Sequence, residues 1–330
     1  MTAALANVEN REVNQHVGIF GKNLIDRWVK FAGVGKASIV TYSKSLRQLF
    51  KYFQSKNITA PTRDNLVEWV AGMDAAVDEE KMSASTVVLY VMATKLFFRW
   101  LAQENLYPNI ADNLKAAHKP DNTFKKDALD TEQCKTLVAN VKCISKKRGK
   151  RNAIMELRDK AILSLMVTAG LRTIEVVRAN VGDIRFERGK IFLLVKGKGR
   201  SSSNEKILIS KQTYAAIRRY LNARGKCEAS EPLFTSTSVN HKGDRLQTQS
   251  ISRMVKANLR GMELDSPRLT AHSLRHSAAT NMVFAHIELP KVQKVLRHRS
   301  ISTTQIYVDA YDRFTNDSEQ VIADIIFGGE

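Results

Sequence analysis

Apolar residues recur at helical spacing through the first third of this chain, and this periodicity constrains its fold more than any other feature. The clearest stripe follows Ser38, a suitable helix N-cap, and consists of Ile39, Tyr42, Leu46, Leu49, Phe50 and Phe53. Side chains spaced by three and four residues share one face of a helix, so this stripe predicts an amphipathic helix with one buried side. No strand-like alternation interrupts residues 17–105. The sequence therefore predicts a small helical domain here.

The alternation of helical and polar stretches predicts two domains. In the first domain, further helices are expected at 17–32, after Thr62 and from near Ser85. A polar, weakly periodic stretch with Pro108 and Pro120 follows, and its composition is typical of a linker. The length of 330 residues also favours two domains over one. The predicted division is a flexible N-terminus at 1–16, a helical domain at 17–107, a linker at 108–128 and a second domain at 129–330.

The second domain is predicted to be mainly α-helical with a small antiparallel β-sheet. The β-rich runs KIFLLV, residues 190–195, and KILI, residues 206–209, flank the sequence GKGRSSSNE, which is typical of a hairpin. A helix at 155–169 is expected to end at Gly170, because glycine favours the left-handed backbone of helix ends. Other helices are expected from near Asp130 or Thr131 and at 174–179, 211–224, 250–260, 271–285, 288–297, 302–309 and 316–327.

The charge balance points to a polyanionic partner. The chain has 52 Lys and Arg against 33 Asp and Glu, a formal net charge of +19. Such an excess favours nucleic acid, since binding releases counterions from the phosphates. Six basic residues fall within 142–151, a run that is either a solvated loop or a loop that contacts phosphate. The charge alone leaves the chemistry open.

Composition and residue spacing also argue against disulfides, bound metal ions and a nucleotide cofactor. Cys134, Cys143 and Cys227 are too few and too scattered for a disulfide framework or a zinc site, so we interpret them as reduced and structural. The seven histidines show no HExxH motif and no paired Cys/His spacing, and we interpret the acidic run at 74–80 as a solvated helix end. No phosphate-binding loop of the G-x-x-x-x-G-K-[ST] type is present. We therefore expect no metal and no cofactor.

The chain is expected to be soluble and cytoplasmic, with no membrane partner. No run of apolar residues approaches the roughly 18 to 20 needed to span a bilayer. The first residues, MTAALANVENREVNQHV, lack the basic start and apolar block of a secretory signal.

Three short segments of the second domain carry the residue types of phosphate chemistry. They are Ala169-Gly-Leu-Arg-Thr-Ile-Glu175, His272-Ser-Leu-Arg-His276 and Leu296-Arg-His-Arg-Ser-Ile-Ser-Thr-Thr-Gln-Ile-Tyr307. Each is uninformative alone: an arginine after a glycine is usually at the surface, and a tyrosine near a C-terminus usually packs in a core. Their order and separation make the case together.

In this order the segments resemble the tyrosine recombinase family, which includes phage-type integrases and Xer-type resolvases. That family combines an arginine in an [AT]-G-L-R-x-x-E segment, a lysine in a β-hairpin turn, H-x-x-R, a histidine or tryptophan, and a tyrosine. The matching positions here are Arg172 with Glu175, Lys198, His272 with Arg275, His298 and Tyr307. The resemblance extends to the helical first domain and covers most of the chain beyond about residue 15.

Two details depart from the family pattern or leave it open. Many relatives have L-G-H-S around the third-motif histidine, whereas this chain reads Leu296-Arg297-His298-Arg299-Ser300. The extra basic residues are candidates for phosphate contacts. The lysine is matched best by Lys198, between two glycines that permit a tight turn, but Lys196 remains an alternative.

The resemblance implies a DNA strand transferase that needs neither metal nor nucleotide. Arg172 and Arg275 would bind the non-bridging oxygens of the scissile phosphate, and His298 would add a hydrogen bond. Tyr307 would attack phosphorus, with His272 as proton acceptor or orienting group. Lys198 would protonate the leaving 5′ oxygen. The product would be a 3′-phosphotyrosine with a free 5′ hydroxyl, and Glu175, three residues after Arg172, would orient its neighbours.

The resemblance also implies how the chain meets its DNA and its partners. We expect the two domains to clamp double-stranded DNA recombination sites, with contacts from Lys44, Arg47, Lys95, Arg99 and Arg200. We expect a dimer on each site and a tetramer in the synapse. Near the C-terminus, Val321, Ile322, Ile325 and Ile326 form an apolar segment that either folds onto its own domain or, as we favour, docks on a neighbouring protomer.

Two other functions remain open at this stage. A type IB topoisomerase shares the tyrosine and the arginine pair but acts alone to relax supercoils; the helical first domain and the apolar tail favour the recombinase. A non-catalytic DNA-binding regulator would explain the charge and the helices, but it has no need of six catalytic-type residues in this order.

Overall fold

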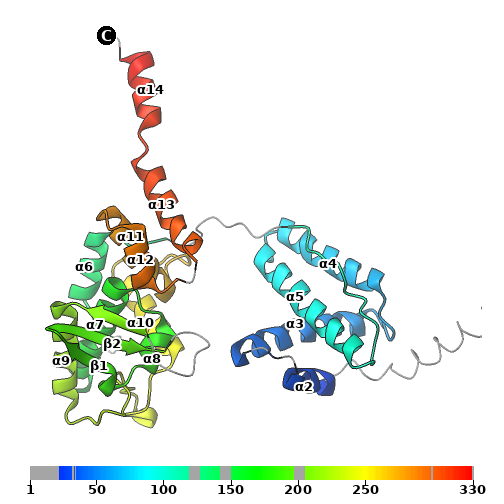
Figure 1. Cartoon of the computed structure of the whole chain (residues 1–330), viewed down its shortest axis with the longest axis horizontal. Helices are drawn as coiled ribbons and strands as arrows, with labels where there is room; N and C mark the ends of the chain where they lie inside the picture. Colours follow the sequence, from blue (N-terminus) through cyan, green and yellow to red (C-terminus); the bar gives the residue numbers. More distant parts are fainter. Residues whose placement is uncertain are drawn as a thin grey trace, which may run out of the picture. The chain divides into compact units, whose positions relative to one another are not determined.

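The chain divides into two compact units, each with its own hydrophobic core. The computed structural model describes residues 22–31, 33, 35–118, 127–141, 150–196, 205–298 and 300–328. The first unit spans Met1–Asn122 and the second spans Thr123–Glu330 (Figure 1). The clamp that the two domains are expected to form around a DNA duplex stays a prediction.

The first unit is built from helices, as predicted. They are α2 (Lys22–Phe31), α3 (Lys36–Ser55), α4 (Arg63–Asp78) and α5 (Ala84–Gln103). The stripe that begins at Ile39 turns inward on α3, where Leu46 and Leu49 are fully buried. Aromatic rings from three helices meet at its centre: Phe97 lies 6.1 Å from Trp28 and 5.6 Å from Phe50, centroid to centroid. The α4 start is fixed by Thr62, whose backbone N–H donates to Asn65 Oδ1 at 2.8 Å.

Part of the predicted linker packs in this core instead. Ala111 and Leu114 are buried among the helices of the first unit. The backbone N–H of Ala117 donates to Oδ2 of Asp74 at 2.9 Å, and Asp74 is itself buried. The prediction that the linker starts at residue 108 is wrong, as is the interpretation of Asp74 as solvated. Periodicity could not reveal these contacts, because an irregular segment buries single side chains without a repeating pattern.

Helix α5 is long and apolar enough, by length and composition alone, to cross a membrane. The absence of long uninterrupted apolar runs does not predict this property of α5. Its apolar residues have a place in the first unit, since Val87, Phe97, Phe98 and Leu101 are fully buried in the core. Burial within the unit therefore accounts for the apolar character of α5.

The second unit is mainly helical with a three-stranded antiparallel sheet. Its helices are α6 (Thr131–Ala139), α7 (Lys150–Ala169), α8 (Thr173–Arg178), α9 (Lys211–Arg224), α10 (Thr248–Arg260), α11 (Ala271–Phe284), α12 (Leu289–Leu296), α13 (Ser302–Thr315) and α14 (Ser318–Phe327), with short 3-10 turns at Val181–Asp183 and Val239–His241. The strands are β1 (Ile184–Glu187), β2 (Lys190–Val195) and β3 (Glu205–Ile209), in that order across the sheet. The predicted fold class, mainly α with a small antiparallel sheet, is confirmed.

The sheet contains one strand that the sequence analysis missed. Strand β1 pairs with β2 through a two-residue turn at Arg188 and Gly189, both with positive φ angles of 49° and 73°. Such a turn matches the twist of the paired strands. The predicted hairpin joins β2 to β3, with Val195 opposite Glu205. Its tip, residues 197–204, lies outside the described residues, as does most of the basic run at 142–149.

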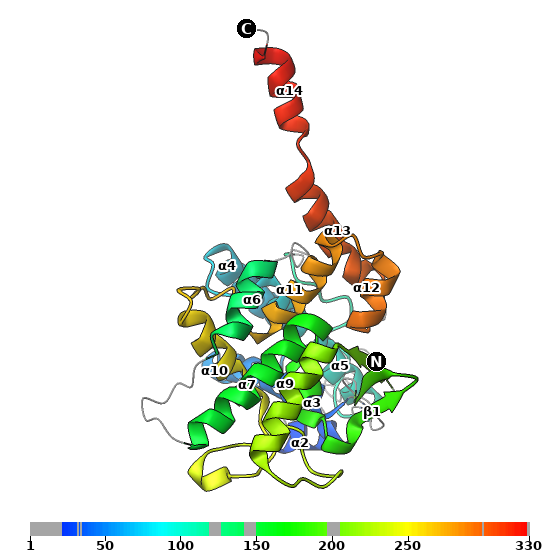
Figure 2. The same ribbon diagram turned by 90° about the vertical axis from the view of Figure 1, so that its left-hand side faces the viewer.

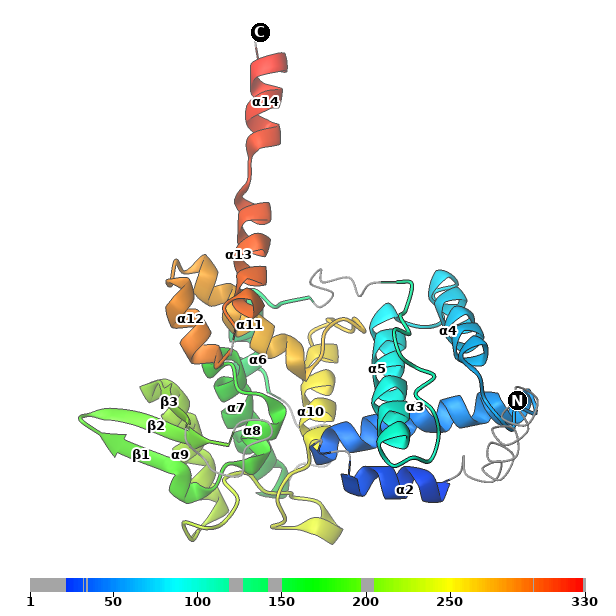
Figure 3. The ribbon, with the colours of Figure 1, turned by 45° about the vertical axis from the view of Figure 1, so that its right-hand side comes forward.

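Helices α11, α12 and α13 gather at one end of the second unit (Figure 3). They share a small core that contains Ala279, Val292, Leu296 and Tyr307. Helix α14 follows α13 and extends away from the rest of the unit, with no buried residue (Figure 2). The two cysteines in the described part of the chain, Cys134 and Cys227, are free thiols.

We expect Gly170→Ala to destabilise the second unit more than Gly189→Ala. Both glycines have positive φ, 59° and 73°, which costs a residue with a Cβ atom about 1–2 kcal/mol. At Gly170 a Cβ would also lie 2.8 Å from Cδ2 of Leu296, whereas nothing lies within 4 Å at Gly189. The clash should add about 1 kcal/mol or more. Calorimetric unfolding of the full chain measures both, and equal losses would show that the packing at Gly170 accommodates a methyl group.

Candidate active site

The turn between α7 and α8 places Arg172 and Glu175 together. Gly170, with φ of 59°, reverses the chain after α7, and Arg172 becomes the N-cap of α8. Glu175, one turn into the helix, accepts hydrogen bonds from the Arg172 backbone N–H at 2.8 Å and from its guanidinium Nη1 at 2.9 Å. The three-residue spacing of Arg172 and Glu175 is therefore that of a capping box, in which the carboxylate returns to the helix start.

Arg275 joins this turn to the end of α12. Its side chain is 2% exposed, and its guanidinium donates to the carbonyl of Gly170 at 2.6 Å and to the carbonyl of Leu296. Burial, and then the charges of Arg172 and Arg297, lower the pKa of Arg275 to about 9. The guanidinium therefore keeps its proton at neutral pH.

The Tyr307 side chain is buried, and its hydroxyl contacts the half-buried His276. Tyr307, on α13, is 2% exposed, and its hydroxyl oxygen lies 2.6 Å from Nδ1 of His276 on α11. Burial raises the pKa of Tyr307 to about 12, while the charges of Arg275 and Arg172 act in the opposite direction. Tyr307 is thus held as a neutral phenol with a histidine nitrogen at its hydroxyl.

The histidine chosen from the sequence, His272, lies one helical turn away. Its side chain is exposed, and its ring meets that of His276 edge to face, with centroids 4.5 Å apart. Both histidines belong to the segment His272-Ser-Leu-Arg-His276, and a spacing of four places them on one face of α11. The H-x-x-R pattern selects His272, and nothing in the residue spacing shows that His276, on the same face of α11, is the histidine that contacts Tyr307.

His298 lies beside Tyr307 on the turn after α12. Its Nδ1 is 2.9 Å from the hydroxyl of Thr304, and its ring is nearly parallel to that of Tyr307, at 13° and a centroid distance of 6.5 Å. Burial, followed by the charges of Arg275, Arg172 and Arg297, lowers the pKa of His298 to about 4. At neutral pH it is an uncharged imidazole with one N–H to donate.

A third arginine, Arg297, completes the cluster. Its side chain is 6% exposed, and Nη2 lies 2.6 Å from Oε2 of Glu175. Burial acts to raise the pKa of Glu175, but the charge of Arg297, the backbone hydrogen bond from Arg172 and the side-chain hydrogen bond from Arg297 hold it below its usual range. In the sequence, the departure from L-G-H-S draws attention to Arg297, but it does not predict the ion pair with Glu175.

The remaining predicted residues are placed in part. Lys198 and Arg200 lie outside the described residues, and Lys196 is half-buried directly after β2. On the first unit, Lys44, Arg47 and Arg99 are exposed and Lys95 is half-buried. Within the described ranges, no cluster of three or more His, Cys, Asp or Glu side chains could hold a metal ion.

These groups form a site suited to an anionic substrate and a phenolic nucleophile. Two arginines and an uncharged histidine supply charge and hydrogen-bond donors for anionic oxygens. A tyrosine hydroxyl with a histidine nitrogen beside it supplies a group that can attack once it loses its proton.

Two family profiles match most of the chain. The profile of the phage integrase family covers residues 127–313, and that of the phage integrase N-terminal SAM-like domain covers residues 30–105. Similar curated proteins include tyrosine recombinase XerC of Herpetosiphon aurantiacus, 31% identical over 83% of this chain and 85% of that protein. Another is tyrosine recombinase XerC of Roseiflexus castenholzii, 29% identical over 89% of this chain and 88% of that protein.

Solved structures share the fold. The post-cleavage complex of XerH site-specific recombinase with a palindromic difH substrate superposes with a TM-score of 0.67, at 22% identity, over 88% of this chain and 80% of that chain. A lambda integrase dimer bound to a COC′ core site has a TM-score of 0.60, at 17% identity, over 86% of this chain and 76% of that chain.

We expect His298 to titrate near pH 4 in the folded protein. Because the unfolded histidine has a pKa of about 6.5, the unfolded chain binds more protons between these values. The stability due to this group is therefore complete above about pH 6.5 and is lost as the pH falls towards 4. NMR titration of the imidazole measures the pKa, with His298→Gln to assign the signal. A titration midpoint near pH 6.5 would show that the His298 imidazole is not withdrawn from water in the folded protein.

Proposed function

The chain belongs to the phage integrase family, and we propose that it is a site-specific tyrosine recombinase that cuts and rejoins double-stranded DNA. The observation that carries the proposal is the convergence of Tyr307, two arginines and an uncharged histidine in one small region of the second unit. The charge of +19 supports DNA as the substrate. The cytoplasm is the proposed compartment.

Arg172 and Arg275 are proposed to hold the scissile phosphate. A guanidinium carries five N–H donors, so Arg275 retains donors beyond the two that bind the carbonyls of Gly170 and Leu296. Attack on phosphorus increases the negative charge on the non-bridging oxygens, and fixed cations stabilise that charge more than they stabilise the ground state. His298 is proposed to add one neutral hydrogen bond to the same oxygens.

Tyr307 is proposed as the nucleophile. A bond forms between its oxygen and phosphorus, the bond from phosphorus to the 5′ oxygen breaks, and the products are a 3′-phosphotyrosine and a 5′ hydroxyl. The phenol must lose its proton, and the 2.6 Å contact supports His276 as the group that holds or accepts it. His272, first suggested for that role, is proposed to face the DNA from its exposed position one turn away.

Lys198 is proposed to donate the proton that the 5′ oxygen takes up, with Lys196 as the alternative. The base of their hairpin lies beside the cluster, since Oε2 of Glu205 is 3.7 Å from Nε of Arg297. The phosphotyrosine retains the energy of the broken phosphodiester, so the proposed reaction needs no nucleotide and no metal ion.

We further propose that residues 17–107 form a core-binding domain that contacts DNA through Lys44, Arg47, Lys95 and Arg99. The exposed positions of Lys44, Arg47 and Arg99 on helices α3 and α5 support this. Residues 129–330 would form the catalytic domain, with Arg200 near the DNA, and the linker would be shorter than residues 108–128.

The recombinase is proposed to act as a dimer on each site and as a tetramer in the synapse. Helix α14 exposes a row of apolar side chains, with Ile325 72% and Phe327 78% exposed. Residues 316–330 contain four acidic residues and no basic one. Such a segment is costly to leave in water and suits a docking site on a positively charged partner copy.

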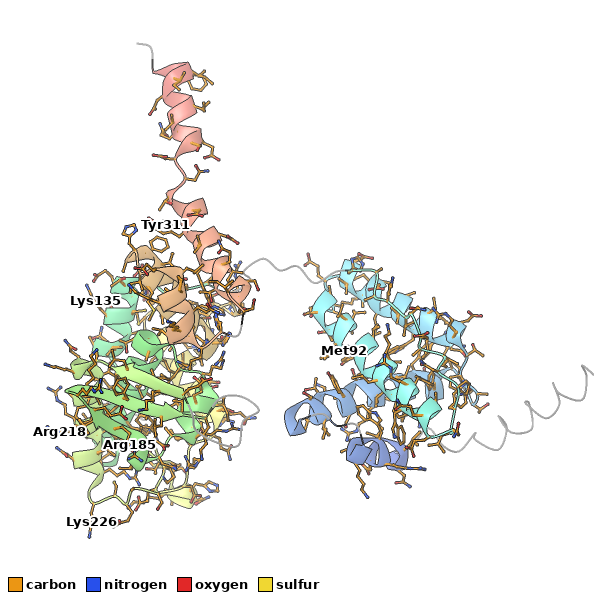
Figure 4. The ribbon with its side chains drawn as sticks, in the orientation of Figure 1. Met92, Lys135, Arg185, Arg218, Lys226 and Tyr311 are labelled. Atoms are coloured by element: carbon orange, nitrogen blue, oxygen red, sulfur yellow. The ribbon has the colours of Figure 1, made fainter. Side chains whose placement is uncertain are left out.

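A groove on the second unit supports a docking site for this segment. It has a volume of about 660 Å³ and lies between α6, α7, α9 and α11. Its walls include Val138, Val167 and Ala216, and Lys135, Lys160 and Arg219 border it; Lys135 is labelled in Figure 4. An apolar floor with a basic rim matches an apolar helix with acidic ends, so we propose that α14 of one protomer occupies this groove on the next.

Covalent trapping on a suicide DNA substrate tests the function. In the presence of a metal chelator, the wild-type protein should form a covalent adduct at Tyr307, and Tyr307→Phe should form none. Arg172→Ala should form the adduct about 10²- to 10³-fold more slowly. Tyr311→Phe, on the same helix, is the control and should behave as wild type. Tight binding with no adduct would favour a DNA-binding regulator. Relaxation of supercoils without strand exchange would favour a topoisomerase.

Deletion of residues 316–330 tests the proposed exchange of α14. We expect the shortened chain to bind a single site with unchanged affinity but to form no tetrameric synapse, as measured by native electrophoresis and light scattering. Ile325→Asp should have the same effect without shortening the chain, because Ile325 is exposed and lies outside every core. Synapsis and recombination at wild-type levels in both variants would rule the exchange out.

A further inference from the structure

Arg297 occupies a backbone conformation that an arginine does not favour. It follows the last residue of α12 with φ of 56° and ψ of 44°, in the left-handed region. Every residue with a Cβ atom is disfavoured there relative to glycine. A side chain retained at such a position requires interactions that offset the backbone cost. Apart from a local hydrogen bond from Nη1 to the carbonyl of Val295, the contacts of the Arg297 guanidinium are with the turn between α7 and α8 and with the base of the hairpin.

The Arg297 guanidinium reaches three parts of the second unit. Nη2 lies 2.6 Å from Oε2 of Glu175 and 3.5 Å from the carbonyl oxygen of Gly170. On its other side, Nε lies 3.7 Å from Oε2 of Glu205, at the base of the hairpin. With 6% exposure, the side chain is largely withdrawn from water, so its main counter-charge is the buried carboxylate of Glu175.

Glu175 is thereby shared between two arginines. Its Oε1 accepts from the guanidinium of Arg172 at 2.9 Å, while its Oε2 accepts from Arg297 and from the backbone of Arg172. The carboxylate is completely buried, whereas the Arg172 side chain is 28% exposed. The partly exposed guanidinium of Arg172 can therefore contact a substrate, whereas the buried carboxylate of Glu175 can act only by orienting Arg172.

We propose that Arg297 is a positioning residue for the recombinase reaction, which fixes the Glu175 carboxylate and through it the Arg172 guanidinium that binds the scissile phosphate. It also links the turn that bears His298 to the turn that bears Arg172. The inference rests on the proposed function. It assigns a role in this chain to a position where the family pattern quoted above has glycine.

The charges around Glu175 make the role measurable through pH. Arg172 faces it from the start of α8, Arg297 from the end of α12 and Arg275 from α11, while Glu205 on β3 faces Arg297. Burial alone would raise the pKa of Glu175, and Arg297 is the first charge that opposes this. Without Arg297 the carboxylate should bind a proton at higher pH, and Arg172 should then lose its orienting partner.

The test is single-turnover adduct formation by the full-length chain with Arg297→Gly, Arg297→Lys and Lys291→Gln. Glycine suits the backbone, so Arg297→Gly removes the side chain without adding strain. Its cleavage rate should fall roughly ten- to a hundredfold at saturating DNA, with little change in affinity, as for other lost orienting contacts. The acidic limb of its pH–rate profile should move to higher pH, and Arg297→Lys should restore much of both.

Lys291→Gln is the matched control, because it removes one exposed positive charge from α12, 65% exposed at the side chain. It should cleave as wild type. In a Glu175→Gln background, Arg297→Gly should cost little more, because both act through one carboxylate.

Four outcomes would overturn the inference. They are an Arg297→Gly rate equal to wild type, a loss confined to DNA affinity, an unshifted acidic limb, and full additivity with Glu175→Gln. If thermal melting shows that Arg297→Gly folds poorly, the acidic limbs of the pH–rate profiles of Arg297→Lys and Arg297→Gln test the inference instead. Wild-type protein that forms no adduct would instead refute the proposed function itself, and this inference with it.

Discussion

The guanidinium of Arg275, buried on α11, bonds to backbone carbonyls from two distant parts of the second unit. Gly170 begins the turn after α7 and Leu296 is the last residue of α12, so one side chain on α11 connects the ends of two other helices. Arg172 follows the first carbonyl by two residues, and His298 follows the second by two. A buried guanidinium that is no longer hydrated requires hydrogen-bond acceptors in the protein. Because its two acceptors lie near Arg172 and His298 in the chain, Arg275 also brings these site residues close together.

The same arrangement concentrates positive charge around a single buried carboxylate. Arg172, Arg275 and Arg297 repel one another, and Glu175 is the one carboxylate in contact with two of them among the described residues. Repulsion of this kind disfavours the empty site and is relieved when an anion enters. The low pKa of His298 has the same origin, since burial and adjacent cations both disfavour a further charge.

The sequence predicted the helices well, because their apolar stripes repeat over several turns, as in α3. It failed where the structure depends on contacts without a repeat. Strand β1 has only four residues and no buried face, although the Arg188–Gly189 turn was a usable sign of it. The residues around Leu114 were assigned to a linker because an irregular segment shows no period when it packs on helices.

The amino-acid sequence by itself determined which residue types the site contains, their order, and the local geometry of Arg172 with Glu175, because a three-residue spacing at a helix start fixes that contact. Only the tertiary structure decided which histidine meets Tyr307. His272 and His276 lie on one face of α11, and the packing of α13 against that helix places His276 at the hydroxyl. Likewise, Arg297 and Glu175 are far apart in the sequence, and only the approach of α12 to α8 pairs them.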